Sequence, residues 1–135
     1  MSENKLVHTK DLTPEDVDGL AAFVEERLSA YQNREMPRLE TDEGKILYGL
    51  RRAVEQTVIS LNVNFRQFER LVTEDDRRGL IRYWYDVRDE WNRLVSMTYA
   101  WREEPGYNTD RWLHTPYLDA DDQQRNQELN GQDRG

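Results

Sequence analysis

The sequence predicts an all-α protein: two long helices form an antiparallel hairpin, and a shorter N-terminal helix closes it into a three-helix bundle. Residues 13–31, 41–72 and 73–101 place apolar side chains at spacings of three and four, the period of one helical face. Each segment also begins with a pattern typical of a helix N-terminus. The chain has 135 residues, which is about one domain.

The first predicted helix begins after Thr13, a favoured N-cap residue. Pro14 suits the first helical position, and Glu15 and Asp16 favour the positive end of the helix dipole. The apolar stripe comprises Val17, Leu20, Ala21, Val24, Leu28 and Tyr31. Pro37 ends the segment, because proline disfavours helix at the residue before it.

The second predicted helix begins near Thr41 and carries a heptad-like seam for more than three heptads. The seam comprises Leu47, Leu50, Val54, Val58, Leu61, Phe65, Phe68 and Val72. Gly49 is a weak point, since glycine costs ~1 kcal/mol relative to alanine in a helix interior.

The third predicted helix begins with a capping pattern over residues 73–76, with Thr73 as the N-cap. Its seam comprises Leu80, Trp84, Val87, Trp91, Leu94, Thr98 and Trp101. Almost no linker separates it from the second helix, so we expect an antiparallel hairpin. One continuous helix that dimerises is the alternative.

The helical pattern stops after Trp101. Pro105 and Gly106 indicate a turn, and the aromatic residues that follow are too frequent for free coil, so we expect residues 105–118 to pack across the bundle. Residues 1–118 then form one helical domain. Residues 119–135 have no aromatic residue and carry five acids, which predicts a disordered acidic tail.

The composition excludes several classes of protein. The chain has 27 acidic and 19 basic residues, a net charge of −8, and no cysteine. Disulfide scaffolds, thiolate catalysis and cysteine-ligated metals are therefore excluded. No apolar run is long enough to span a bilayer, and the N-terminus lacks a signal-peptide core, so we expect a cytoplasmic protein without a membrane partner.

Arginines lie along the predicted hairpin but alternate with acids. They are Arg51, Arg52, Arg66, Arg70, Arg77, Arg78 and Arg82. Binding several phosphates requires a net basic face, so direct nucleic-acid binding is not expected. The opposite possibility is an acidic DNA mimic, with a negative face formed by Asp11, Glu15, Asp16, Asp18, Glu25 and Glu26.

Carboxylate pairs suggest an enzymatic alternative, a metal-dependent all-α nucleotide pyrophosphohydrolase. The candidate magnesium ligands are the pairs Glu40/Glu43 and Asp86/Asp89, with Glu90 adjacent. Their separation exceeds that family's pattern, and a solvated helix face explains the second pair equally well. We therefore expect no metal, cofactor or catalytic residue. His8 and His114 are isolated, and no glycine-rich phosphate loop is present.

Aromatic residues give the strongest indication of an interaction site in this sequence. Tyr83, Trp84 and Tyr85 are consecutive, so on a helix they point about 100° apart and cannot all face one core. The candidate interaction residues are Tyr83, Tyr85, Tyr99, Tyr107 and Trp112. In the interpretation we favour, residues 107–118 cover Tyr83, Tyr85 and Tyr99. Otherwise these side chains form an exposed aromatic patch of the kind enriched at protein interfaces.

Two stretches of the chain resemble a family of short actinobacterial and actinophage proteins that has no established activity. The motifs are Leu20-x-x-Phe23-Val24-x-x-Arg27-Leu28, then Tyr99-Ala100, Pro105-x-Tyr107 and Trp112. The resemblance covers about a third of the chain and implies an origin and a size. We expect a non-enzymatic, cytoplasmic interaction or regulatory protein, a phage accessory protein that acts on a host or partner protein. A homodimer is also compatible with the tryptophan-rich seam.

Overall fold

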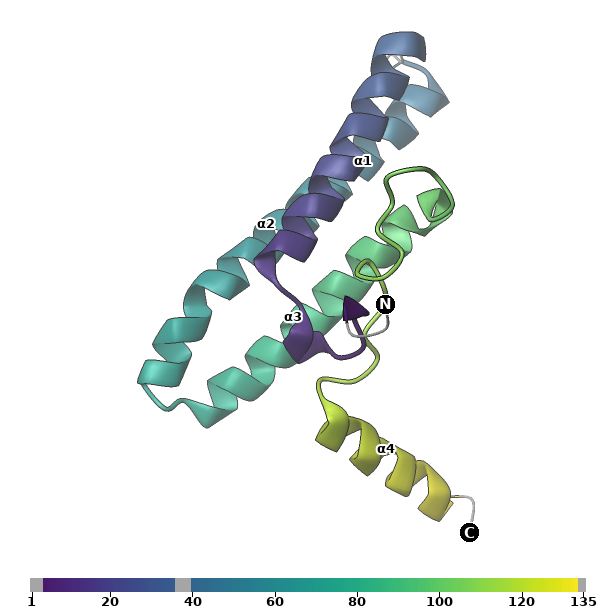
Figure 1. Ribbon diagram of the computed structural model, residues 1–135. Helices are drawn as coiled ribbons and strands as arrows, with labels where there is room; N and C mark the ends of the chain where they lie inside the picture. The colour runs from purple at the N-terminus through teal and green to yellow at the C-terminus, as the bar shows by residue number, and fades with distance from the viewer. Residues whose placement is uncertain (1–3, 36–39, 134–135) are drawn as a thin grey trace.

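The computed structural model describes residues 4–35 and 40–133 and confirms the all-α fold (Figure 1). Its helices are α1 (Pro14–Glu35), α2 (Asp42–Thr73), α3 (Arg77–Thr98) and α4 (Ala120–Asp133), with short 3-10 helices η2 (Thr9–Asp11) and η3 (Tyr99–Trp101). Helices α2 and α3 pack antiparallel along the lower part of the view, and α1 lies along α2. No described helix is long and apolar enough to cross a membrane.

Helix α1 begins where the sequence predicts. The Asp16 backbone N–H donates to the Thr13 hydroxyl at 3.3 Å, and the Thr13 backbone N–H donates to the Asp16 carboxylate at 2.9 Å. This reciprocal pair satisfies two backbone donors at the helix end. The predicted stripe is buried at Val17, Leu20, Val24 and Leu28. Pro37 and the side chain of Tyr31 lie outside the described residues.

Helix α2 is capped by the Thr41 hydroxyl, which accepts a hydrogen bond from the Gly44 backbone at 3.0 Å. Val54 and Leu61 are buried, and the partly buried seam residues pack against the core; these are Leu47, Leu50, Val58, Phe65 and Phe68. The prediction for Val72 is wrong, because it is 51% exposed and Leu71 is buried instead. Leu71 packs against the start of α3, since its Cδ2 atom lies 2.8 Å from where a Cβ on Gly79 would be.

The turn between α2 and α3 lies three residues later than predicted. Thr73 is the last residue of α2, whereas Asp76 caps α3 by accepting from the Gly79 backbone at 2.9 Å. Asp75 has a φ of 51°, and the Asp76 backbone N–H donates to the Leu71 carbonyl at 3.0 Å. A left-handed residue followed by this hydrogen bond reverses the chain after a helix. The single continuous helix is therefore excluded.

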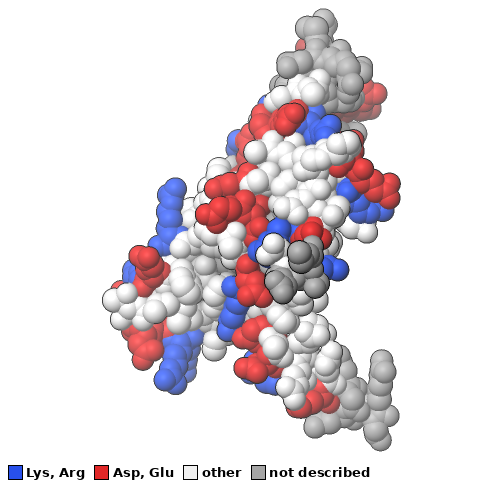
Figure 2. Space-filling model, in the orientation of Figure 1, with Lys and Arg blue, Asp and Glu red and all other residues white. Residues whose placement is uncertain are grey.

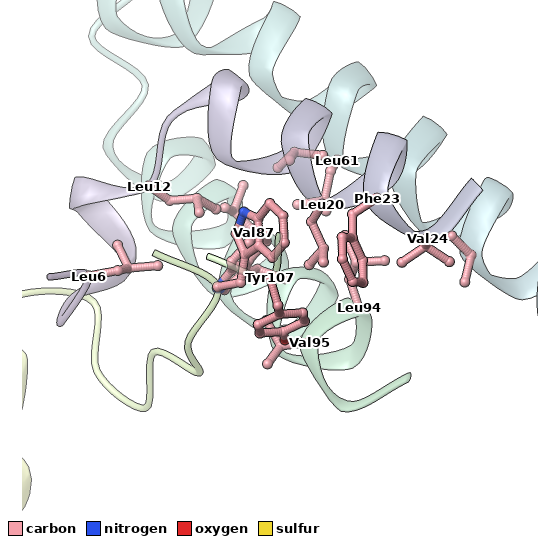
Figure 3. Close-up of a cluster of buried hydrophobic side chains, with 14 of the residues drawn as sticks. Leu6, Leu12, Leu20, Phe23, Val24, Leu61, Val87, Leu94, Val95 and Tyr107 are labelled. Atoms are coloured by element: carbon pink, nitrogen blue, oxygen red, sulfur yellow. The ribbon is translucent and has the colours of Figure 1, made fainter. Parts of the chain in front are cut away.

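Helix α3 buries a wider face than its predicted seam. Val87, Trp91, Leu94 and Thr98 are fully buried as predicted, and Leu80, Trp84 and Trp101 are partly buried. Tyr83 and Val95 are buried in addition. The reason is that α3 is covered from several sides, by α2, by the N-terminal segment and by residues 105–118. Figure 3 shows side chains from all of these segments meeting in one core.

The segment after η3 packs across α3 as predicted. The Trp91 indole N–H donates to the Leu113 carbonyl at 2.7 Å, and Asn92 exchanges two hydrogen bonds with the backbone of Thr115, at 2.7 and 3.1 Å. These contacts satisfy polar groups of an irregular segment that lies against a buried helix face.

The structure differs from the sequence-based expectation of disorder beyond residue 118, because Ala120–Asp133 form helix α4. The Asp119 carboxylate accepts from the Asp122 backbone N–H at 2.8 Å, and the Asp122 carboxylate accepts from the Leu118 backbone N–H at 2.9 Å. The acids that suggest a solvated tail thus cap a helix start. Helix α4 extends away from the bundle (Figure 1).

Candidate interaction surface

The N-terminal segment, residues 6–12, lies against residues 110–118. The Leu6 backbone N–H donates to the Asp110 carbonyl at 2.8 Å, and the Thr9 backbone N–H donates to the Tyr117 carbonyl at 3.1 Å. The hydroxyls of Thr9 and Thr115, both fully buried, lie 2.9 Å apart. We call this paired region the strap. It fixes the C-terminal segment on the bundle.

An ion pair anchors the strap to α1. Arg111 donates to both carboxylate oxygens of Asp16, at 3.0 and 2.7 Å, and also to the backbone carbonyls of Asn4 and Asp11. Burial of Asp16 disfavours its charged form, but the hydrogen bonds from Arg111 and Thr13 outweigh this and hold its pKa below the ordinary value. Arg111 was not singled out from the sequence, because nothing local distinguishes it from the other arginines.

Three of the five candidate interaction residues are buried. The rings of Tyr107 and Trp112 meet edge to face at 4.9 Å between centroids, and each lies 5.5 Å from the Phe23 ring. Tyr83 packs 5.3 Å from Phe68, and its burial raises its pKa to about 12. The Tyr107 hydroxyl is buried without a hydrogen-bond partner. These three residues therefore contribute to the core in this structure.

The other two candidates, Tyr85 and Tyr99, are 38% and 49% exposed. Arg88 stacks on the Tyr85 ring at 4.9 Å, and Arg102 stacks on the Tyr99 ring at 4.0 Å. Fourteen residues of helical rise place them about 21 Å apart, so they form two separate points rather than one patch.

A larger apolar feature lies between α1, α2 and η3. It is a groove of about 420 Å³ lined by Arg27, Leu28, Ala30, Glu43, Ile46, Leu47, Leu50, Trp101 and Glu104. Ile46 is 70% exposed on one wall, and Trp101 is partly buried on another. We call it the overhang groove, because α2 has 32 residues and α3 only 22. The seam residues Leu47 and Leu50 looked like ordinary core in the sequence.

A second groove, of about 290 Å³, lies between α1 and α2. Its lining is Ala21, Val24, Glu25, Leu28, Arg51, Val54, Glu55, Val58 and Ile59. The Arg51 guanidinium lies 3.6 Å from Glu25, and its Nε atom is buried without a hydrogen-bond partner. Unlike the overhang groove, this one is crossed by a charged side chain.

The candidate metal ligands do not come together. Glu43 lies at the start of α2 beside Trp101 and Glu104, whereas Asp89 lies on α3 and contacts Arg88 at 3.0 Å. The Glu90 carboxylate accepts hydrogen bonds from Ser60 and Asn64 at 2.6 and 3.1 Å. Within residues 4–35 and 40–133, no three histidine or acidic side chains converge in a group that could hold a metal ion.

Acidic and basic side chains are interspersed over the visible face of the molecule (Figure 2). Two of the six acids proposed for a DNA-like face are paired with arginines, Asp16 with Arg111 and Glu25 with Arg51. On the hairpin, Arg52 and Arg70 pair with neighbouring glutamates. The described residues thus give neither a continuous acidic face nor a continuous basic one in this view.

The two histidines make structural contacts. His8 lies 2.9 Å from the Gln123 side chain, which joins the strap to α4, and His114 lies 2.9 Å from the Ser96 hydroxyl. Neither is paired with a carboxylate, as a catalytic base of the serine-hydrolase type would be.

No protein-family model, curated protein or solved structure matches this chain.

Proposed function

We propose that this chain is a non-enzymatic protein that acts by binding another protein. The overhang groove carries the proposal, because three elements of a packed bundle hold its apolar walls open to solvent. Exposed apolar surface of this kind is typical of interaction sites. Ile46, Tyr48 and Ile59, all on α2, are each more than half exposed. Ile46 and Ile59 line the two grooves, and Tyr48 adds exposed aromatic surface outside them.

The biological setting we propose follows the family resemblance. A short protein of actinobacterial or actinophage type, working in the cytoplasm, would act as an accessory or regulatory factor on a host or partner protein. The resemblance motifs Phe23, Tyr107 and Trp112 form one aromatic cluster, which supports a shared core rather than a shared contact surface.

The enzymatic alternative has less support. A pyrophosphohydrolase of the helical type needs its carboxylates on facing helices around one metal ion. Here Glu43 lies beside η3, and Glu90 is hydrogen-bonded within the α2–α3 hairpin. The DNA-mimic alternative needs a row of unpaired acids, and Asp16 and Glu25 are already paired.

The test is affinity capture from an actinobacterial lysate, with the wild-type chain and the variant Ile46→Glu immobilised in parallel. Captured proteins are identified by mass spectrometry, purified, and titrated against the chain by calorimetry. We expect one protein to bind the wild type saturably. If no purified candidate binds with a measurable Kd, the proposed function is wrong.

A further inference from the structure

The overhang groove lies beside the first turns of α2, beyond the end of α3. Across the α2–α3 hairpin, Ser60 hydrogen-bonds to Glu90, and the Phe68 ring lies 5.6 Å from the Trp84 ring. This antiparallel register brings Thr98, the last residue of α3, near the level of Val54. The part of α2 before that level is therefore flanked by α1 and η3, and the overhang groove lies between these three elements.

The walls of the groove fit the apolar face of a helix. Leu28 comes from α1, Leu50 and the exposed Ile46 from α2, and Trp101 from η3. Amphipathic helices bind in apolar grooves of this kind through side chains spaced by three and four residues. Tryptophan is also one of the residues that most often dominate interface energies.

The charges at the groove select its occupant. Arg27 is already satisfied, since it lies 3.0 Å from Glu104 and donates to the Pro105 carbonyl at 2.9 Å. Glu43 also lines the groove, and it makes no hydrogen bond or ion pair with any other described residue. Among the described side chains that line the groove, Glu43 is thus the one charge without an ion-pair partner. A net charge of −8 disfavours a second copy of this chain and favours a basic partner.

We infer that the overhang groove binds an amphipathic helix of a basic partner protein. The apolar face of that helix packs on Ile46, Leu50 and Trp101, and a lysine or arginine of the partner lies beside Glu43. This inference rests on the proposed function and names the surface and the chemistry of the partner.

The probe is a synthetic helical peptide with leucine at positions i, i+3, i+4 and i+7 and lysine on its flanks, titrated into the full chain by calorimetry. We expect saturable one-to-one binding, with amide NMR shifts centred on residues 43–50 and the Trp101 indole. A peptide with glutamate in place of lysine, and a scrambled leucine–lysine peptide, should each bind at least about tenfold more weakly.

Two variants test the assigned residues. Glu43→Lys should weaken binding of the lysine peptide by about tenfold, whereas Glu69→Lys, an exposed acid of α2 away from the groove, should leave it unchanged. Ile46→Glu places a charge on the apolar wall of the groove and should weaken binding at least as much. Circular dichroism verifies that each variant is folded.

Equal binding by Glu43→Lys and Glu69→Lys, equal affinity for the scrambled peptide, or NMR shifts outside the groove would overturn the inference. So would a dimer in sedimentation velocity that Ile46→Glu dissociates, because a second copy would then fill the groove. The inference can fail while the proposed function holds. If a lysate partner still binds Ile46→Glu and Glu43→Lys with wild-type affinity, the chain is an interaction protein but this groove is not its site.

Discussion

Arg111 and Asp16, which are 95 residues apart, form a two-pronged ion pair, with the Arg111 Nε and Nη2 atoms 3.0 and 2.7 Å from the two carboxylate oxygens of Asp16. The same guanidinium donates to the Asn4 and Asp11 carbonyls. One side chain thus connects residues 105–118, the N-terminal segment and the first turn of α1. Arginine suits this role because its donors form a rigid fork, which lysine lacks.

Asp16→Asn should lower the free energy of unfolding at pH 7 by about 1–2 kcal/mol, because it removes the charge that Arg111 pairs with. The pKa of Asp16 is lowered in the folded state, so its stabilisation is present above the unfolded pKa of about 4 and is lost as the pH falls further. Urea unfolding from pH 7 to pH 3 measures this. The difference between wild type and variant should shrink below about pH 4.

Asp18→Asn is the matched control, since Asp18 is exposed on the same helix. It should change stability by less than about 0.5 kcal/mol at either pH. A similar loss in both variants would mean that the general charge of α1, rather than the pair with Arg111, determines its acid sensitivity.

Tyr107→Phe should raise the free energy of unfolding by about 1 kcal/mol. The Tyr107 hydroxyl is buried without a partner, whereas water hydrates it in the unfolded chain. Thermal or urea unfolding measures the change. A clear loss of stability would show that the hydroxyl has a hydrogen bond in solution.

Trp91→Phe is the contrasting variant within the same core. It removes the donor to the Leu113 carbonyl and leaves space around a fully buried position. We expect a loss of about 2–3 kcal/mol, and the near-ultraviolet circular dichroism of the aromatic core should weaken. If the free energy of unfolding of Trp91→Phe were higher than that of Tyr107→Phe, the described packing of residues 107–118 would be wrong.

Gly49→Ala and Gly79→Ala should have opposite effects on stability. Open space surrounds Gly49, so alanine should stabilise α2 by up to about 1 kcal/mol. A Cβ on Gly79 would lie 2.5 Å from the Asp76 carboxylate and 2.8 Å from Leu71, so alanine there should cost about 1 kcal/mol through a weakened cap. Thermal midpoints of the two variants against wild type provide the measurement. A shift of the same sign in both would contradict the described turn.

Tyr83 should titrate later than the exposed tyrosines. Its pKa is raised to about 12 by burial, so the tyrosinate absorbance at 295 nm should show one late group that Tyr83→Phe removes. Because the folded pKa lies above the unfolded pKa of about 10, this group's stabilisation is complete below pH 10 and is lost as the pH rises toward 12.

The sequence predicts the three bundle helices well because their signals are local. The caps at Thr13 and Thr41 and the stripes of α1 and α2 depend on residues within a few turns of one another. Thr73 was mistaken for a cap because it opens a run of acids, and the left-handed Asp75 that sets the turn has no strong sequence signal. Leu71 is buried in place of Val72 because it packs against the start of α3 at the turn, and periodicity does not determine that contact.

The interaction surface could be predicted only in part. Whether Tyr83 is exposed depends on Phe68 and on the width of the face that α3 buries, which periodicity does not determine. The overhang groove arises from the difference in length between α2 and α3, and the predicted helices were nearly equal. The contact between Arg111 and Asp16 joins distant segments, and no local pattern encodes it.

The strap also determines the order in which the fold can be completed. Hairpins between α1, α2 and α3 join neighbouring segments and can form while the chain is still being synthesised, since local contacts form fastest. Leu6 and Thr9 instead hydrogen-bond to Asp110 and Tyr117, more than 100 residues later. Residues 6–9 are therefore synthesised long before their partners, and until residues 110–117 follow, the apolar face of α3 that faces the strap stays exposed.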